Sequence, residues 1–218
     1  MQIQEHLMAG CRRLAAKGLL QSSSDSFSLL IPGECGMLFV SGLLNWRDIC
    51  ESDLRSISFD APDNQSKLHA AVYSARSDVG AIALSSPRGA RLLAGFGGVL
   101  PTLFDEQARH IGTPSRPVDC SSSVSFEKLC KKFSRQGNAA ISGTQLLCLG
   151  MTCERVLFNS ELFEKCAQAY VIARASGYKI GRIPWWVRLI ANRRLIKDQR
   201  NAALSYQKGL IPENIGGY

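Results

Sequence analysis

The sequence has 218 residues, with 26 Lys or Arg against 18 Asp or Glu and a net charge of +8. This length suits one compact domain with an arm, and 45% hydrophobic residues allow a core that needs neither disulfides nor metals. The N-terminus lacks the pattern of a secretory signal and no apolar run approaches about 18 residues, so we expect a cytoplasmic protein without a transmembrane segment. The eight cysteines are dispersed without a CxxC pair, and we expect reduced core residues.

The first part of the chain predicts a helix and then a β-hairpin. Residues 4–19 have apolar side chains at helical spacing, and Gly18 lies where a helix end is capped. Polar and apolar residues alternate over 26–31, and a second apolar run covers 37–40 after Pro32-Gly33. The elements expected next are a helical turn at 46–49 and a strand around 57–59.

Helices and strands continue to alternate over the rest of the chain. Helices are expected at 66–77, 88–94, 103–112, 126–136 and 156–176, and buried strands at 79–84 and 145–149. Residues 113–125 are expected to be irregular. Because the elements alternate without a repeat, the sequence predicts an α/β domain over residues 1–177.

The remaining residues, 178–218, predict a basic helical extension. They contain eight basic and two acidic residues, so most of the net charge lies in this arm. Pro184 suits the start of a helix, and Trp185 and Trp186 follow it. We expect the Trp-rich face of this helix to pack on the body or on a neighbouring subunit. Alternatives are a protein partner held by the two tryptophans and the basic tail, or a membrane surface. The adjacent tryptophans disfavour nucleic-acid binding.

Several stretches resemble known motifs in the same order. Gly18-Leu19-Leu20 and the Ser-rich turn after it are similar to GLVxGTSGNIS, and Val40-Ser41-Gly42 is similar to a T/S-G turn. Residues 62–73 are similar to PSSExxxHxxIY. Residues 68–94, LHAAVYSARSDVGAIALSSPRGARLLA, are similar to LHxxIYxxRPDVGAVVHTHSPYATALA. Over residues 4–177 the sequence therefore resembles the class II aldolase/adducin family of metal-dependent sugar-phosphate aldolases and epimerases.

The resemblance implies a single α/β/α domain with a central, mainly antiparallel sheet flanked by helices, and a homo-oligomer, typically a tetramer. It also implies a metal site that this sequence does not preserve. The family's HxH pair corresponds to Leu84 and Ser86, its later His to Thr144, and its acid/base Glu to Gln65. A leucine cannot bind a metal, hydroxyls are poor zinc ligands and an amide cannot take up a proton near neutral pH. We therefore expect a degenerate zinc site with no metal and no cofactor.

The family's phosphate-binding positions are also changed. Ser26, Ser41-Gly42 and Asp63-Asn64 occupy them, and a carboxylate at Asp63 would repel a phosphate. The expected polar pocket is formed by Asp25, Ser26, Ser41, Gly42, Asp63, Asn64, Gln65, Ser85, Ser86, Arg88 and Thr144. It is either a relic or a site for another small molecule that is not phosphorylated.

These departures predict a pseudoenzyme: a class II aldolase-like protein without metal-dependent aldolase or epimerase activity that acts in binding or assembly. The alternative is a metal-independent lyase, decarboxylase or isomerase acting on a small molecule in the same cleft. For that alternative, Asp63 and His69 are the candidate catalytic residues. His69 is otherwise expected to be a packed, hydrogen-bonded residue of a helix.

Overall fold

The computed structural model describes residues 2–112, 117, 137–177 and 179–213. The helices are α1 (Gln2–Ala16), α2 (Lys67–Ala75), α3 (Arg88–Gly95), α4 (Asp105–His110), α6 (Cys153–Ala175) and α7 (Trp185–Gln207), with a 3-10 turn at Glu51–Asp53. The strands are β1 (Ser26–Leu30), β2 (Gly36–Ser41), β3 (Arg55–Ser58), β4 (Ala81–Ser85), β5 (Ala139–Ser142) and β6 (Gln145–Gly150).

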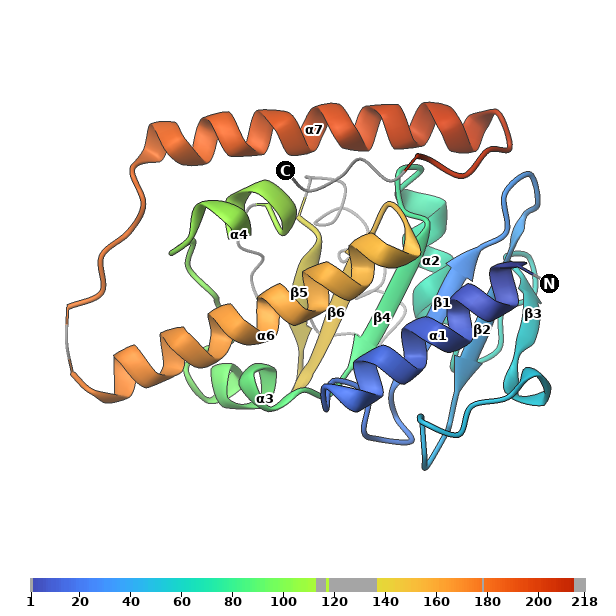
Figure 1. The fold of residues 1–218 in the computed structure, drawn as a ribbon, viewed down its shortest axis with the longest axis horizontal. Helices are drawn as coiled ribbons and strands as arrows, with labels where there is room; N and C mark the ends of the chain where they lie inside the picture. The colour runs from blue at the N-terminus through green and yellow to red at the C-terminus, as the bar shows by residue number, and fades with distance from the viewer. Residues whose placement is uncertain (1, 113–116, 118–136, 178, 214–218) are drawn as a thin grey trace.

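The strands form one antiparallel sheet in the order β3-β2-β1-β4-β6-β5 (Figure 1). Helices cover both faces of this sheet, as expected for an α/β/α domain. Side chains alternate along β6, so that Leu146 and Cys148 face one layer and Leu147 and Leu149 face the other. The central strands β4 and β6 are therefore buried on both sides, which explains why they read as apolar runs.

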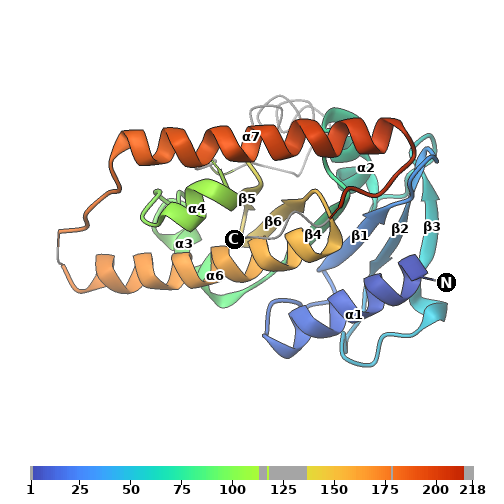
Figure 2. The ribbon, with the colours of Figure 1, turned by 45° about the horizontal axis from the view of Figure 1, so that its top comes forward.

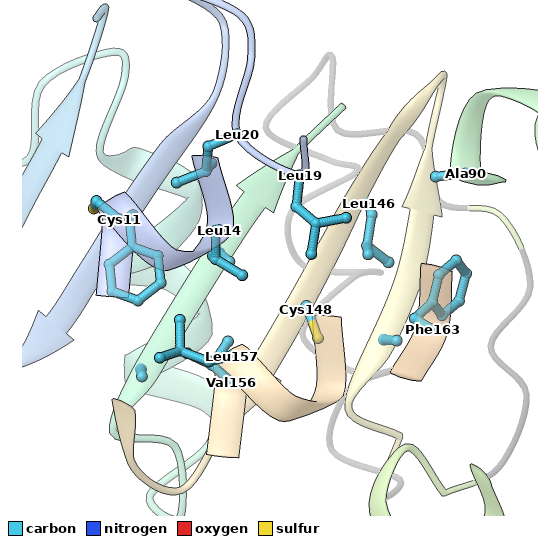
Figure 3. Packing of buried hydrophobic residues seen from close by; sticks show 14 of the residues in the cluster. Cys11, Leu14, Leu19, Leu20, Ala90, Leu146, Cys148, Val156, Leu157 and Phe163 are labelled. Carbon is cyan, nitrogen blue, oxygen red and sulfur yellow. The ribbon is translucent and has the colours of Figure 1, made fainter. Parts of the chain in front are cut away.

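The larger core lies between the sheet and helices α1, α3 and α6. Leu14 of α1, Leu157 of α6 and Cys148 of β6 belong to this layer, as Figure 3 shows. On the other face, Leu68 and Val72 of α2 pack against the sheet. Full burial of such apolar side chains contributes about 1.5–3 kcal/mol each, so these two layers supply most of the driving force for folding.

Helix α7 lies along one edge of the molecule, beside α4 (Figures 1 and 2). Leu195 and Ala202 form a small apolar cluster with Met151, and the Tyr206 hydroxyl donates a hydrogen bond to the Met151 carbonyl oxygen at 2.7 Å. The expected packing of a Trp-rich face on the body is not what the structure has, because Trp185 is 68% and Trp186 54% exposed, whereas packing of this face on a neighbouring subunit stays a prediction. The side of α7 that faces the body carries Leu195, Asp198, Gln199 and Ala202, and the two tryptophans lie outside this buried set.

Most elements expected from the sequence are confirmed. Gly18 follows α1 with φ 68°, a left-handed backbone conformation that glycine adopts without strain. At 46–49, where a short helical turn was expected, the chain forms a single hydrogen-bonded turn in which the Asp48 N–H donates to the Asn45 carbonyl oxygen at 3.4 Å, and Trp46 anchors it by burying its ring. Strand β5 was not predicted because its four residues are too few to show a period. The helix expected at 126–136 and most of the segment 113–125 lie outside the described residues. Among the described helices, none is long and apolar enough to span a bilayer.

Candidate functional site

The residues singled out in the sequence gather at one end of the sheet. Ser26 at the start of β1 lies opposite Ser41 at the end of β2 and opposite Leu84 in β4. Ser85 pairs with Leu146 at the start of β6, next to the turn that contains Thr144. Because the strands are antiparallel, the starts of β1 and β6 and the ends of β2 and β4 meet at this edge. The sheet topology thus brings together segments that are far apart in sequence, as the 121-residue separation of the Gln145–Ser24 hydrogen bond shows.

Asp25 is fully buried in the loop before β1 and its carboxylate is saturated with hydrogen bonds. One oxygen, Oδ2, accepts the backbone N–H groups of Gln21 and Ser22 at 2.8 and 2.9 Å. The other, Oδ1, accepts the Ser86 hydroxyl at 2.7 Å. The buried carboxylate is stabilised by these donors, which shape the loop. Both Asp25 and Ser86 are therefore engaged inside the protein.

Asp63 lies between α2 and an arginine that the sequence did not single out. Its Oδ1 accepts the Ser66 hydroxyl at 2.7 Å and the backbone N–H groups of Gln65 and Ser66 at 3.0 and 2.8 Å, just before α2. Its Oδ2 accepts the Arg55 guanidinium at 2.5 Å. The Ser66 hydroxyl, and then the Ser66 backbone and Arg55, lower the pKa of Asp63. Asp63 is thus a carboxylate near neutral pH, so it lacks the proton that a general acid needs.

Arg55 also ties together the other polar groups of the expected phosphate-binding region. Its Nη2 donates to Ser41 Oγ and to Gln65 Oε1, each at 3.1 Å, and its guanidinium lies 5.2 Å from the centre of the Phe39 ring. The Ser41 hydroxyl donates to Gln65 Oε1 at 2.9 Å. Sequence reasoning missed Arg55 because it lies in an edge strand outside the quoted motifs. The expected repulsion by Asp63 is therefore offset by a cation within the same cluster.

His69 is fully buried on α2, and both of its ring nitrogens have serine partners. Nε2 lies 2.9 Å from Ser26 Oγ and Nδ1 lies 2.7 Å from Ser28 Oγ, while Ser28 Oγ also lies 2.9 Å from the Tyr73 hydroxyl. Burial lowers the pKa of His69 to about 3. The ring is therefore neutral, with one nitrogen donating and the other accepting. This network accounts for the burial of Ser26 and Ser28 in β1, which the alternation of polar residues did not predict.

Of the remaining pocket residues, Ser85 is fully buried, and its hydroxyl has no hydrogen-bond partner within the described residues, whereas Gly42, Asn64, Arg88 and Thr144 are exposed. Gly42 adopts φ 78° in the turn after β2, Asn64 accepts a hydrogen bond from Lys67 Nζ at 2.8 Å, and Thr144 is exposed in the β5–β6 turn. Arg88 is also exposed, at the start of α3. The backbone N–H of Gly89 in this first turn donates to both carboxylate oxygens of Glu164, at 2.7 and 2.9 Å. The N-terminus of α3 is thus already paired with an internal anion.

No group of three or more His, Cys, Asp or Glu side chains among the described residues is arranged to hold a metal ion. Four residues occupy the positions where the sequence comparison expects the family's histidines and glutamate. Of these, Ser86 donates to Asp25 and Gln65 accepts from Ser41, whereas Leu84 is a partly buried apolar residue and Thr144 is exposed.

The family model of the class II aldolase and adducin N-terminal domain matches residues 5–171. The chain belongs to the class II aldolase and adducin family. Helix α7 lies beyond the matched residues of this class II aldolase-family domain. A search of curated protein sequences finds no match.

Solved structures share the fold of this class II aldolase-family protein. An L-fuculose 1-phosphate aldolase is similar with a TM-score of 0.78 and 18% identity, over 90% of this chain and 97% of that one. The L-fuculose-1-phosphate aldolase from Thermus thermophilus has a TM-score of 0.69 and 17% identity, over 82% and 98% of the two chains. YgbL from Klebsiella pneumoniae has a TM-score of 0.75 and 16% identity, over 87% and 97%. At these identities the likeness establishes the fold alone, so function must be argued from the site.

Proposed function

We propose that this class II aldolase-family protein is a binding or assembly protein without metal-dependent aldolase or epimerase activity. The observation that carries the proposal is the set of residues at the family's four chemical positions. Leu84, Ser86 and Thr144 replace the metal-binding histidines, and Gln65 replaces the acid/base glutamate. These residues do not fit a divalent metal, because a leucine has no donor atom and neutral hydroxyls are poor ligands.

The hydrogen bonds of the site support the same proposal. Ser86 donates to Asp25, so recruiting its hydroxyl elsewhere would leave a buried carboxylate with one donor fewer. Arg55 bridges Asp63, Ser41 and Gln65 at the positions where the family binds phosphate. A phosphate ligand would have to compete with Asp63 for this guanidinium. We infer that the cleft is maintained by internal contacts and that any ligand is a small molecule without a phosphate group.

The assembly part of the proposal concerns subunits and partners. We propose that the protein is cytoplasmic and forms a homo-oligomer, a tetramer as the family resemblance implies. Each chain is proposed to consist of a body, residues 1–177, and an extension, residues 178–218. The exposed Trp185 and Trp186 and the basic extension are proposed to bind a protein partner. Light scattering of the purified protein tests the oligomer, and a monomer at assay concentrations would contradict it.

Metal analysis combined with a cleavage assay tests the proposal directly. The purified protein is expected to contain far less than one transition metal ion per chain, and to cleave no ketose phosphate when zinc is supplied. A stoichiometric metal with ketose-phosphate cleavage would overturn the proposal.

The alternative function, that of a metal-independent enzyme, can be tested with two variants. Asp63→Asn and His69→Ala are compared with the wild-type chain in a screen for lyase, decarboxylase and isomerase turnover of non-phosphorylated substrates. Turnover that is lost in either variant would support such an enzyme and contradict the binding role. Absence of turnover in the wild-type chain is the result that the binding role predicts.

A further inference from the structure

One stripe of exposed residues runs along the outward side of α7. Its members follow one another at intervals of four or three residues, which places them on one face of a helix. The stripe comprises Trp186, Ile190, Arg193, Lys197, Arg200 and Leu204, all exposed. Apolar residues thus occupy both ends of the stripe and cations occupy its centre. At a rise of 1.5 Å per residue, the two ends are about 27 Å apart.

The cations of this α7 stripe lack a counter-charge. Asp198, the acidic residue of α7, is turned toward the body and accepts the Arg109 guanidinium at 2.5 Å. In the described part of the chain, neither Arg193, Lys197 nor Arg200 forms an ion pair. A cationic surface of this kind attracts a complementary anionic one and steers its approach.

A cavity of about 270 Å³ lies beside the apolar end of the α7 stripe, between α7 and the region of α4. Trp185, Leu189 and Ala108 form apolar parts of its lining, and Arg188 and Asn192 add polar groups. Within the described residues, Asn192 Oδ1 is buried without a hydrogen-bond donor. The cavity falls below the range of about 300–1,000 Å³ typical of small-molecule pockets. Its lining residues on α7 are not members of the stripe, so the cavity lies on the flank of α7 toward α4 and leaves the stripe itself open.

We propose that the α7 stripe binds an acidic amphipathic helix of another protein, with apolar residues near its two ends and carboxylates between them. This inference rests on the proposed binding role and identifies the chemistry of the partner. The central carboxylates pair with Arg193, Lys197 and Arg200, and the apolar residues at the two ends pack on Trp186 with Ile190 and on Leu204. Helix-in-groove recognition of this kind uses apolar anchors for affinity and charges for register.

Two other occupants fit the α7 stripe less well. A second copy packed stripe to stripe would place cations against cations, which disfavours association. A bilayer surface would accept the apolar ends only if Arg193 and Lys197, which point in the same direction, were pressed toward the hydrocarbon. An acidic amphipathic helix offers apolar residues to the ends of the stripe and carboxylates to the cations at its centre.

Selection from a display library of random 24-residue peptides against the full-length protein tests this proposal. We expect enriched peptides to carry Asp or Glu in the centre and apolar residues near both ends. The best of them, synthesised with a fluorophore, is titrated by anisotropy. Binding is expected to weaken about tenfold or more in Arg193→Glu/Lys197→Glu and in Trp186→Ala. The matched control, Arg47→Glu/Arg91→Glu, makes the same change in net charge at exposed residues outside α7 and is expected to bind like the wild type.

Circular dichroism verifies that each variant is folded before titration. Selected peptides without acidic enrichment, or equal affinity in the control and the α7 variants, would overturn the proposal. Binding to phosphatidylserine vesicles or to RNA that exceeds peptide binding would also overturn it. Metal content and ketose-phosphate cleavage are measured on the same wild-type preparation. If the protein shows metal-dependent cleavage and also binds the peptide specifically, only the proposed function is overturned. If it shows no cleavage and does not bind the peptide, only the α7 proposal is overturned.

Discussion

Protonation of His69 provides a quantitative test of the buried network in β1 and α2. The ring is fully buried, and burial lowers its pKa from the usual 6.5 to about 3. In the unfolded chain the imidazole takes up a proton as the pH falls through its usual pKa, whereas the folded chain holds it neutral. Stability from this residue is therefore fully present above pH 6.5 and is lost as the pH falls from there toward 3.

The linkage relation gives the size of this effect. Between about pH 7.5 and about pH 5, the two pKa values correspond to a loss of about 2 kcal/mol in the free energy of unfolding. His110 adds in the same direction, since burial lowers its pKa as well. Asp63 and Glu161, whose pKa values are lowered, titrate in more acid solution and do not add to the loss in this range.

Urea unfolding of the wild type and of His69→Gln at the two pH values measures the contribution. The variant is expected to be less stable at about pH 7.5, because Ser26 and Ser28 lose part of their hydrogen bonding, at about 1 kcal/mol per bond. Its further loss on going to about pH 5 should be smaller than that of the wild type by about 2 kcal/mol. His6→Gln, at an exposed position, should behave like the wild type. Equal pH dependence in His69→Gln and the wild type would refute the buried neutral histidine.

Three further substitutions probe α7 and the site. Gly80→Ala would overlap the Tyr206 side chain and the Met151 carbonyl oxygen and is expected to destabilise the protein by about 1–3 kcal/mol in urea unfolding. Gly80→Ala/Tyr206→Ala should be less destabilised than the sum of the two single variants, and additive effects would contradict the contact. Asp198→Asn leaves Arg109 without its carboxylate and should lower the free energy of unfolding by about 1–3 kcal/mol and increase hydrogen exchange in α7. Unchanged exchange in α7 would contradict the claim that this ion pair holds α7 on the body. Arg55→Ala should change stability by less than about 1 kcal/mol, because both partners of its ion pair are about 40% exposed, and a larger loss would show that the cluster is structural.

The order of helices and strands was predictable because each element depends mainly on the local spacing of apolar residues and on turn residues. Polar and apolar residues alternate at the start of β1, β2 is a continuous apolar run, α1 has apolar side chains at helical spacing, and Gly18 marks the end of α1. Strand β5 was missed because it is short. The contact of α7 with the body was not predictable from its tryptophans, because the inward side of the helix satisfies polar groups: Asp198 pairs with Arg109, and Gln199 donates to Asn138.

The sequence motifs indicate where the candidate site residues lie in the fold, but not which side chains they bind. The motifs located Asp63, His69 and Ser86 near one another in the fold, because motif order follows sheet topology. The partners of these residues depend on side chains distant in sequence, such as Arg55 for Asp63 and Asp25 for Ser86. Pairings of this kind have no periodic signal, so a single sequence does not reveal them.

Zinc titration most directly tests the claim that the family's metal chemistry has been lost. Calorimetry compares the wild-type chain with Leu84→His/Ser86→His/Thr144→His, which restores imidazoles at the three positions. The account predicts no stoichiometric zinc binding by the wild type, about one zinc per chain in the variant, and no ketose-phosphate cleavage by the wild type with zinc present. Stoichiometric zinc binding by the wild type together with cleavage would contradict it.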